Sequence, residues 1–293
     1  MTPDPTLPEP PASEALLPPP PGTTDSPRPW PDPRSLQVHR NQPVRDVPYL
    51  PTEEPVVQAM LRLANVTEND VVYDLGCGDG RICIAAAKRG ARAVGVDIDL
   101  VRIRECLENA TRANVRDRVK FLRQSFFDTD LRGATVVMLY LLSNINVKLR
   151  PKLLWELRPG SRLVINHFDI GDWKPDATLK AHHRELSLFI IPAWVQGTWK
   201  CVVNDPGRRR HMTLRLHRHY QQVWGTAQVG RFEVPIADAT LVGERLTFTV
   251  FHPMHAKRAA RYTCRVDGNR MSGMCHLIGD LAQACAWGGT RAQ

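Results

Sequence analysis

A short apolar segment that runs directly into a glycine-rich turn constrains the fold of this chain more than any other feature. Val71–Leu75 predicts a buried strand, and residues 82–89 predict a compact helix. The turn between them reads DLGCGDG (74–80). Because glycines at such a turn let a ligand approach the backbone closely, the segment predicts the first unit of an α/β sheet with a ligand site at its end.

The spacing of Gly76, Gly78 and Gly80 separates two classes of cofactor. A dinucleotide fingerprint has the spacing GxGxxG and offers helix N–H groups to a pyrophosphate. Here the third glycine comes one residue early, and Asp74 stands two residues before the first. A carboxylate there would repel a pyrophosphate, but it suits a cofactor with a cationic amino-acid end and no phosphate. The turn therefore predicts S-adenosylmethionine.

The next predicted strand supplies a complementary group. Residues 93–96 form this strand, and Asp97 closes it, 23 residues after Asp74. An acidic side chain at that position can accept hydrogen bonds from both ribose hydroxyls. Ile98 is then expected to pack on the adenine. The loop after the third strand, with Ser125 and Phe126, is expected to flank the base.

The order of the predicted elements indicates two kinds of architecture. Strands alternate with helices five times up to residue 166, which predicts a Rossmann-like parallel sheet with helices on both faces. The helix before the fifth strand is predicted at 151–157, and Thr52 is predicted to cap the first helix. From about residue 185 strands follow one another without helices, and after Gly207 the period is two, which predicts an antiparallel all-β meander of about six strands, either a small barrel or an open sheet.

Three regions follow from these patterns. Thirteen of the 24 prolines lie in the first 40 residues, so residues 1–43 are predicted to be a disordered proline-rich tail. Residues 44–205 are predicted to be the sheet domain that binds S-adenosylmethionine, and residues 206–293 the antiparallel β domain.

Charge and cysteine content bear on partners and on the compartment. Residues 193–293 hold 14 Lys and Arg against 6 Asp and Glu, which favours acidic partners such as nucleic acid or anionic lipid, although a solvated basic face is the preferred interpretation. The seven cysteines form no CxxC pair and are read as reduced thiols. No apolar run approaches the roughly 20 residues of a membrane span. The prediction is a cytoplasmic protein without a membrane partner, with its oligomeric state left open.

Four segments carry a resemblance to a known family. They are VPYLPT (47–52), VVYDLGCGDGRICIAAAKRGARAVGVDID (71–99), LYLLSNINVKLRPKLLWELRPGSRLV (139–164) and FDIGDWKPD (168–176). Together they resemble a family of seven-strand methyltransferases found in bacteria and mitochondria, which includes protein-lysine methyltransferases and is distantly similar to the non-SET histone lysine methyltransferases. The resemblance implies N-methylation of a protein lysine. It also implies that Tyr49 and Thr52 close over the methionine end of the cofactor. Relatives usually carry an acidic residue where this chain has Ser125.

Candidates for the acceptor side come from analogy with this fold, in which residues that follow the fourth and fifth strands face the methyl group. The catalytic candidates chosen are Tyr140, Asn144 and Asp169, with Asn166 and His167 also in range. The chain has LLSNIN (141–146) where amide and base methylases often place a (D/N)PP(Y/F) tetrad, which argues against the adenine and glutamine methylases.

Several alternatives stay open at this stage. No metal site is predicted, because the pairs His217 with His219 and His252 with His255 lack a third ligand at a useful spacing. The acceptor could instead be a small molecule or RNA. The chain could also be a catalytically silent protein that binds S-adenosylmethionine, and whose basic β domain engages a partner.

Overall fold

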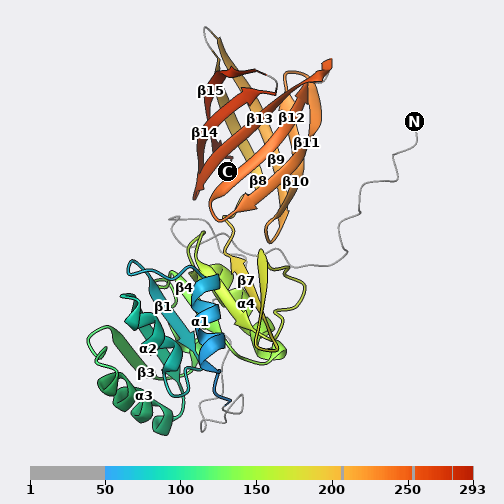
Figure 1. Ribbon diagram of the computed structural model, residues 1–293. Helices are drawn as coiled ribbons and strands as arrows, with labels where there is room; N and C mark the ends of the chain where they lie inside the picture. The colour runs from blue at the N-terminus through green and yellow to red at the C-terminus, as the bar shows by residue number, and fades with distance from the viewer. Residues whose placement is uncertain (1–49, 206–207, 253–254, 279, 293) are drawn as a thin grey trace.

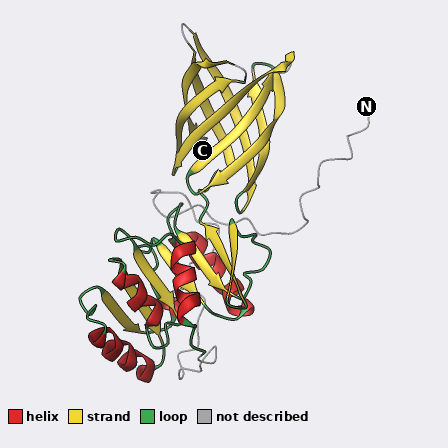
Figure 2. Cartoon of the chain, in the orientation of Figure 1, coloured by secondary structure: helices red, strands yellow, loops and turns green. Residues whose placement is uncertain are grey.

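The computed structural model describes residues 50–205, 208–252, 255–278 and 280–292. They form a mixed α/β part followed by a part made only of strands (Figures 1 and 2). The predicted tail at 1–43 and the candidate Tyr49 lie outside the described residues. No helix in the described ranges has the length and apolar content needed to span a membrane.

A seven-stranded mixed sheet forms the first part, in the order β3-β2-β1-β4-β5-β7-β6. The first five strands are parallel, whereas β7 runs antiparallel to both β5 and β6. The strands are β1 (Val71–Leu75), β2 (Arg92–Asp97), β3 (Val119–Arg123), β4 (Val136–Leu139), β5 (Arg162–Asn166), β6 (Ala177–Ala181) and β7 (Arg184–Ile190). The strand order reverses between β1 and β4, and open α/β sheets bind their ligands at such a switch point.

Helices cover both faces of this sheet, as the alternating pattern predicts. On one face, α1 (Glu54–Leu63), α2 (Arg81–Lys88) and α3 (Leu100–Arg112) pack on inward residues such as Val136 and Met138. On the other face, α4 (Ser143–Glu156) packs on the alternate residues Val137 and Leu139. Successive side chains of a strand point to opposite faces. Because helices cover both faces of the sheet, every residue of β4 is buried.

Two details of the predicted helices are wrong. The α4 helix begins at Ser143 and contains Pro151 in its interior, whereas the prediction places its start at Pro151. The cap of α1 is Glu53 in extended conformation, with no side-chain cap, and Thr52 stands one residue earlier. The α4 backbone follows tertiary packing rather than the local signal of Pro151, because Ile145 and Leu149 bury this helix against the sheet.

The second part is a closed, eight-stranded antiparallel barrel in the order β10-β11-β12-β13-β14-β15-β8-β9. Consecutive strands are neighbours throughout, and the pairing of β15 with β8 closes the ring. The barrel thus has two strands more than the predicted meander. Its strands are β8 (Gly197–Asp205), β9 (Arg208–His219), β10 (Gln222–Val229), β11 (Phe232–Val242), β12 (Arg245–His252), β13 (His255–Asp267), β14 (Arg270–Leu277) and β15 (Asp280–Arg291).

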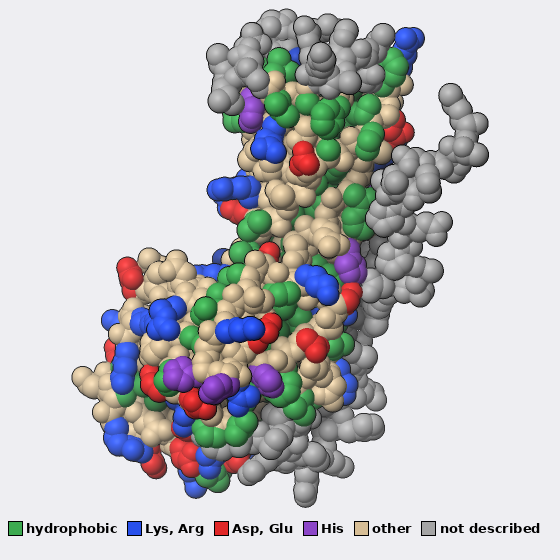
Figure 3. All heavy atoms as spheres, turned by 45° about the vertical axis from the view of Figure 1, so that its right-hand side comes forward, with side chains coloured by type: hydrophobic (Ala, Val, Ile, Leu, Met, Phe, Trp, Pro, Cys, Tyr) green, Lys and Arg blue, Asp and Glu red, His purple; other side chains and the backbone are tan. Residues whose placement is uncertain are grey.

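Side chains fill the barrel interior. Phe248 is fully buried, stacks on Tyr262 with 5.1 Å between ring centroids, and meets Trp287 edge-on at 5.8 Å. Eight strands leave an interior just wide enough for such side chains. The period-two pattern that predicted these strands therefore reflects an apolar interior and a polar exterior. On the visible face of both parts, cationic side chains are interspersed with acidic ones (Figure 3).

Strand pairing bears on the predicted boundary at residue 205. The β8 strand pairs with β9 and β15, so Gly197–Asp205 belongs to the barrel. We therefore propose a division between Ile190, where β7 ends, and Gly197. That the two parts behave as separate domains stays a prediction.

The aromatic cluster makes the barrel sensitive to truncation of Phe248. We expect Phe248→Ala to lower the free energy of unfolding by about 3–5 kcal/mol, because it removes a large buried ring and leaves a cavity. Phe251→Ala on the same strand is the matched control. Its side chain is 45% exposed, so its effect should stay within about 0.5 kcal/mol. Urea unfolding followed by circular dichroism measures both, and equal effects would contradict the filled core.

Candidate functional site

A pocket lies at the carboxyl ends of the parallel strands, at the switch point between β1 and β4. It brings together segments that are far apart in the sequence. Nine of the predicted site residues line it: Thr52, Asp74, Gly76, Gly78, Asp97, Ile98, Ser125, Phe126 and Tyr140.

The glycine turn enters this pocket in a conformation that only glycine adopts readily. Gly76, Gly78 and Gly80 have φ angles of 85°, 54° and 81°, which lie in the left-handed region. The N–H groups of Gly76 and Cys77 donate to the carbonyl of Val96 on β2, at 2.8 and 3.0 Å. Gly80 does not line the pocket. A Cβ there would lie 3.0 Å from Cys106 Sγ and from the Phe121 ring, so the close packing of these side chains also favours glycine at position 80.

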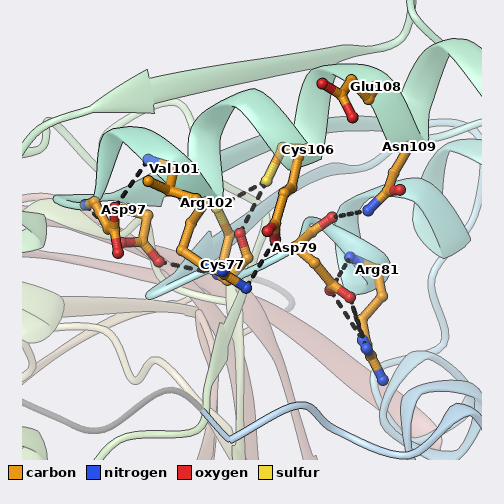
Figure 4. A network of polar contacts seen from close by, with 12 residues as sticks. Cys77, Asp79, Arg81, Asp97, Val101, Arg102, Cys106, Glu108 and Asn109 are labelled. Atoms are coloured by element: carbon orange, nitrogen blue, oxygen red, sulfur yellow. Dashed lines mark hydrogen bonds and ion pairs between the residues drawn. The ribbon is translucent and has the colours of Figure 1, made fainter.

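The α3 helix holds the turn from the opposite side (Figure 4). Cys106 Sγ donates to the carbonyl of Gly78 at 3.1 Å, and Asn109 Nδ2 donates to the carbonyl of Asp79 at 2.9 Å. Asp79 in turn forms an ion pair with Arg81, whose Nη1 donates to the carbonyl of Thr52 at 2.7 Å. The turn is therefore tied both to α3 and to the segment that precedes α1.

Asp74 is the most unusual charge in the pocket. It is 4% exposed, and no cation of the described chain forms an ion pair with it. Burial, together with the negative charges of Asp97 and Asp79, raises the pKa of Asp74 to about 8. A cationic group of a ligand would relieve this unfavourable environment.

Asp97 lies at the end of β2, as predicted, and its two oxygens have separate backbone partners. Oδ2 accepts from the N–H of Gly78 at 3.0 Å, and Oδ1 accepts from the N–H of Asp99 at 2.9 Å. These bonds fix the orientation of the carboxylate beside the glycine turn. Because each carboxylate oxygen has more than one acceptor site, Asp97 can still accept hydrogen bonds from a ligand.

Ile98, Ser125 and Phe126 form the neighbouring wall of the pocket. Ser125 caps a short 3₁₀ turn (Phe126–Asp128), and its Oγ accepts from the N–H of Phe127 at 3.2 Å. Phe126 is buried against Phe127, with 4.8 Å between ring centroids. An apolar wall with one hydroxyl at its edge suits a flat aromatic ring.

Two aromatic rings line the other end of the pocket, after β4 and β5. Tyr140 and Phe168 have ring centroids 5.9 Å apart, and the guanidinium of Arg184 lies 5.5 Å from the centre of the Tyr140 ring. His167 precedes Phe168 with a φ of 72° and contacts its ring edge-on. Phe168 was not among the predicted site residues, although it opens one of the family segments.

The structure does not bring Asn144 or Asp169 into this pocket. Asn144 is exposed in the first turn of α4, because that helix begins before the predicted position. Asp169 is exposed, and its Oδ1 accepts from the N–H of Gly171 at 3.1 Å. Asn166 is buried at the end of β5, and His167 is exposed. A catalytic role for any of them stays a prediction.

Sequence reasoning missed Asn146. This residue is fully buried, and its Nδ2 donates to the carbonyls of Leu141 and Asp169, at 3.1 and 2.9 Å. It therefore joins the loop after β4 to the loop after β5. Its Oδ1 has no hydrogen-bond partner among the described residues. The only signal in the sequence is an asparagine at a position of α4 that faces the sheet.

The histidines considered for metal binding have other neighbours. His219 contacts Asp172 at 2.9 Å, and the exposed His217 stacks on Trp224. The side chains of His252 and His255 lie outside the described part of the chain.

The raised pKa of Asp74 has a consequence for stability. Between about pH 4 and 8 the folded chain keeps the Asp74 proton while the unfolded chain loses it, so this group lowers the free energy of unfolding as the pH rises. Asp74→Asn does not titrate. We expect its melting temperature, relative to the parent chain, to increase from pH 4 to 8 and to level off above. A difference independent of pH would contradict the raised pKa.

Comparisons with known proteins show the family of this chain. Residues 74–177 match the family described as the ANTKMT methyltransferase domain. The chain is 49% identical over 154 residues to a protein-lysine N-methyltransferase of Saccharolobus islandicus, an alignment that covers 50% of this chain and 96% of that protein. It is 32% identical over 142 residues to the adenine nucleotide translocase lysine N-methyltransferase of Mus musculus, covering 48% of this chain and 62% of the mouse protein.

One solved structure is a methyltransferase from Salinibacter ruber, described as an RNA methyltransferase in complex with S-adenosyl-L-homocysteine. It is 46% identical, with a TM-score of 0.49, and the match covers 50% of this chain and 96% of that one. The barrel begins at Gly197, beyond the residues that match the family. Since the Saccharolobus protein aligns over nearly its whole length, this chain belongs to the family of class I, S-adenosylmethionine-dependent methyltransferases that contains it.

Proposed function

We propose that the chain transfers a methyl group from S-adenosylmethionine to the side-chain nitrogen of a protein lysine. The observation that carries the proposal is one pocket that is lined by the glycine turn, by acidic side chains that include Asp74 and Asp97, and by an aromatic pair. The protein-lysine methyltransferase of Saccharolobus islandicus supports lysine as the acceptor.

The residues of the pocket fit the cofactor. Asp74 is a buried carboxylate without a cationic partner in the described chain, and it would accept the α-ammonium of the methionine end. Gly76 and Gly78 line the pocket with backbone alone, and a Cβ on Gly76 would crowd Leu141 Cδ2 at 3.1 Å. Thr52 would close over the same end. Asp97 would hold the ribose hydroxyls, and the wall of Ile98, Ser125 and Phe126 would hold the adenine.

When bound, S-adenosylmethionine supplies a methyl group made electrophilic by the positive sulfur. The acceptor nitrogen forms the new N–C bond as the C–S bond breaks, and the electron pair of that bond stays on sulfur. Since this displacement is in line, the chief task of the protein is to hold the two reactants in position. The nitrogen must first release its proton to attack as a neutral amine.

The aromatic pair would guide the acceptor. Tyr140 and Phe168 present apolar surface beside the pocket, so the methylene chain of a lysine can lie between or along the rings. Exclusion of water there favours the neutral amine over the ammonium. The lysine ammonium would release its proton to solvent before it enters the apolar end of the pocket, since Asp169, the carboxylate among the catalytic candidates, lies away from the pocket lining.

The role of Asp97 predicts a loss of cofactor affinity on substitution. Asp97→Asn keeps one acceptor oxygen, enough for the N–H of Gly78 or that of Asp99, and removes the charge that strengthens the bonds to the ribose. We expect the Kd for S-adenosylmethionine, measured by calorimetry, to rise about tenfold to a hundredfold. Asp117→Asn, on an exposed turn outside the pocket, is the control and should leave the Kd unchanged. Equal affinities for both variants would contradict the assignment.

The acceptor is tested by the chemistry of the product. The full chain is incubated with methyl-labelled S-adenosylmethionine and an extract of the organism that encodes it, and the labelled fraction is hydrolysed to amino acids. We expect the label in N-methyl-lysine. Asp74→Ala should lose this label, because a neutral side chain leaves the ammonium without a partner. Label that is removed by RNase, or found only in small molecules, would overturn the lysine proposal. No label in any fraction would favour a silent binding protein.

A further inference from the structure

The barrel touches the sheet part beside the pocket. One of their contacts joins two short segments. They are a docking turn, made of His219 at the end of β9 with Tyr220 and Gln221, and a junction loop at residues 167–174 between β5 and β6. Phe168, which lines the pocket, is the second residue of the junction loop.

On its barrel side, the junction loop is held by buried contacts. The ring of Trp173 stacks on Tyr220 with 5.3 Å between centroids, and the two side chains are 2% and 6% exposed. Trp173 Nε1 donates to Gln221 Oε1 at 2.9 Å, and Gln221 Nε2 donates to the carbonyl of Lys174 at 2.7 Å. The docking turn thus binds both a side chain and the backbone of the loop.

Asp172 adds polar contacts of smaller weight. Its carboxylate accepts from the Tyr220 hydroxyl at 3.0 Å, and it also pairs with His219 and Arg150. The Asp172 side chain is 45% exposed, and ion pairs at such positions contribute little. The Trp173–Tyr220 stack and the Gln221 hydrogen bonds are therefore the main interactions between the docking turn and the junction loop.

The α4 helix holds the same loop from the other side. Asn146 donates to the carbonyl of Asp169, and Arg150 Nη1 donates to the carbonyl of Ile170 at 3.1 Å. Gly171 has a φ of 83°, and a Cβ there would lie 2.9 Å from Arg150 Nη1, so the loop passes close against α4. The loop is consequently fixed between α4 and the barrel.

We propose that the docking turn of the barrel positions the acceptor wall of the pocket, acting through the junction loop on Phe168. This inference rests on the proposed function, because it assigns Phe168 to the acceptor side. Tyr220 and Gln221 are positioning residues: neither lines the pocket. The glycine turn is held by β2 and α3, so the docking turn affects the acceptor side and leaves the cofactor side unchanged.

Gln221 and its neighbour allow a matched test in the full chain. Gln221→Ala removes both hydrogen bonds to the junction loop. Gln222→Ala makes the same change at the next position, where the side chain is exposed. Tyr220→Phe keeps the ring against Trp173 and loses only the hydroxyl. These variants avoid Tyr220→Ala, which would leave a cavity beside Trp173 and could prevent folding.

Two measurements decide the proposal. In hydrogen exchange, Gln221→Ala should speed exchange of the amides at 168–174 about tenfold, with the amides at 76–80 unchanged. In methyl transfer to extract protein, it should raise the acceptor KM about tenfold while the Kd for S-adenosylmethionine stays within twofold. Gln222→Ala and Tyr220→Phe should behave like the parent chain.

Other results would overturn the proposal. They are unchanged exchange at 168–174, an equal effect of Gln222→Ala, or a loss of cofactor affinity as large as the loss on the acceptor side. The exchange measurement needs no activity. If the parent chain methylates no lysine, the proposed function fails. The exchange rate at 168–174 in Gln221→Ala still tests separately whether the docking turn holds the loop.

Discussion

The cofactor pocket depends on a small set of backbone hydrogen bonds between the end of β1 and the end of β2. The carbonyl of Val96 accepts from two consecutive N–H groups of the glycine turn, and Asp97 accepts from a third, that of Gly78. These bonds require the turn to leave β1 with positive φ angles, which is why glycines occupy the positions that they do. The parallel register of β1 with β2 brings donors and acceptors together.

Electrostatics around this turn favour a cationic ligand. Asp74, Asp79 and Asp97 lie within one pocket, and only Asp79 is neutralised by a described ion pair, with Arg81. Keeping such groups close together costs stability in the free protein. That cost is the physical reason for expecting a positively charged cofactor to bind here, and it acts independently of sequence similarity.

The parts that the sequence predicted well are those set by neighbours along the chain. One β-α-β segment contains the first strand, the glycine turn and the carboxylates at 74 and 97. These residues are close in the chain as well as in space, so the local pattern is enough to predict them. The start of α4 could not be read in the same way, because Pro151 fits a first turn locally and only the packing of Ile145 and Leu149 shows otherwise. Asn146 and the docking turn depend on contacts between distant segments, which periodicity does not encode.

Closure of the barrel gives the chain a different kind of constraint. The first and last barrel strands are neighbours only in space, since β8 begins at Gly197 and β15 ends at Arg291. Deleting either strand would leave two long edges of unpaired backbone groups, and such edges promote aggregation. The barrel can therefore be shortened from neither end. A fragment that contains the junction loop must retain the whole ring, because Trp173 of the loop is buried against Tyr220 of the barrel.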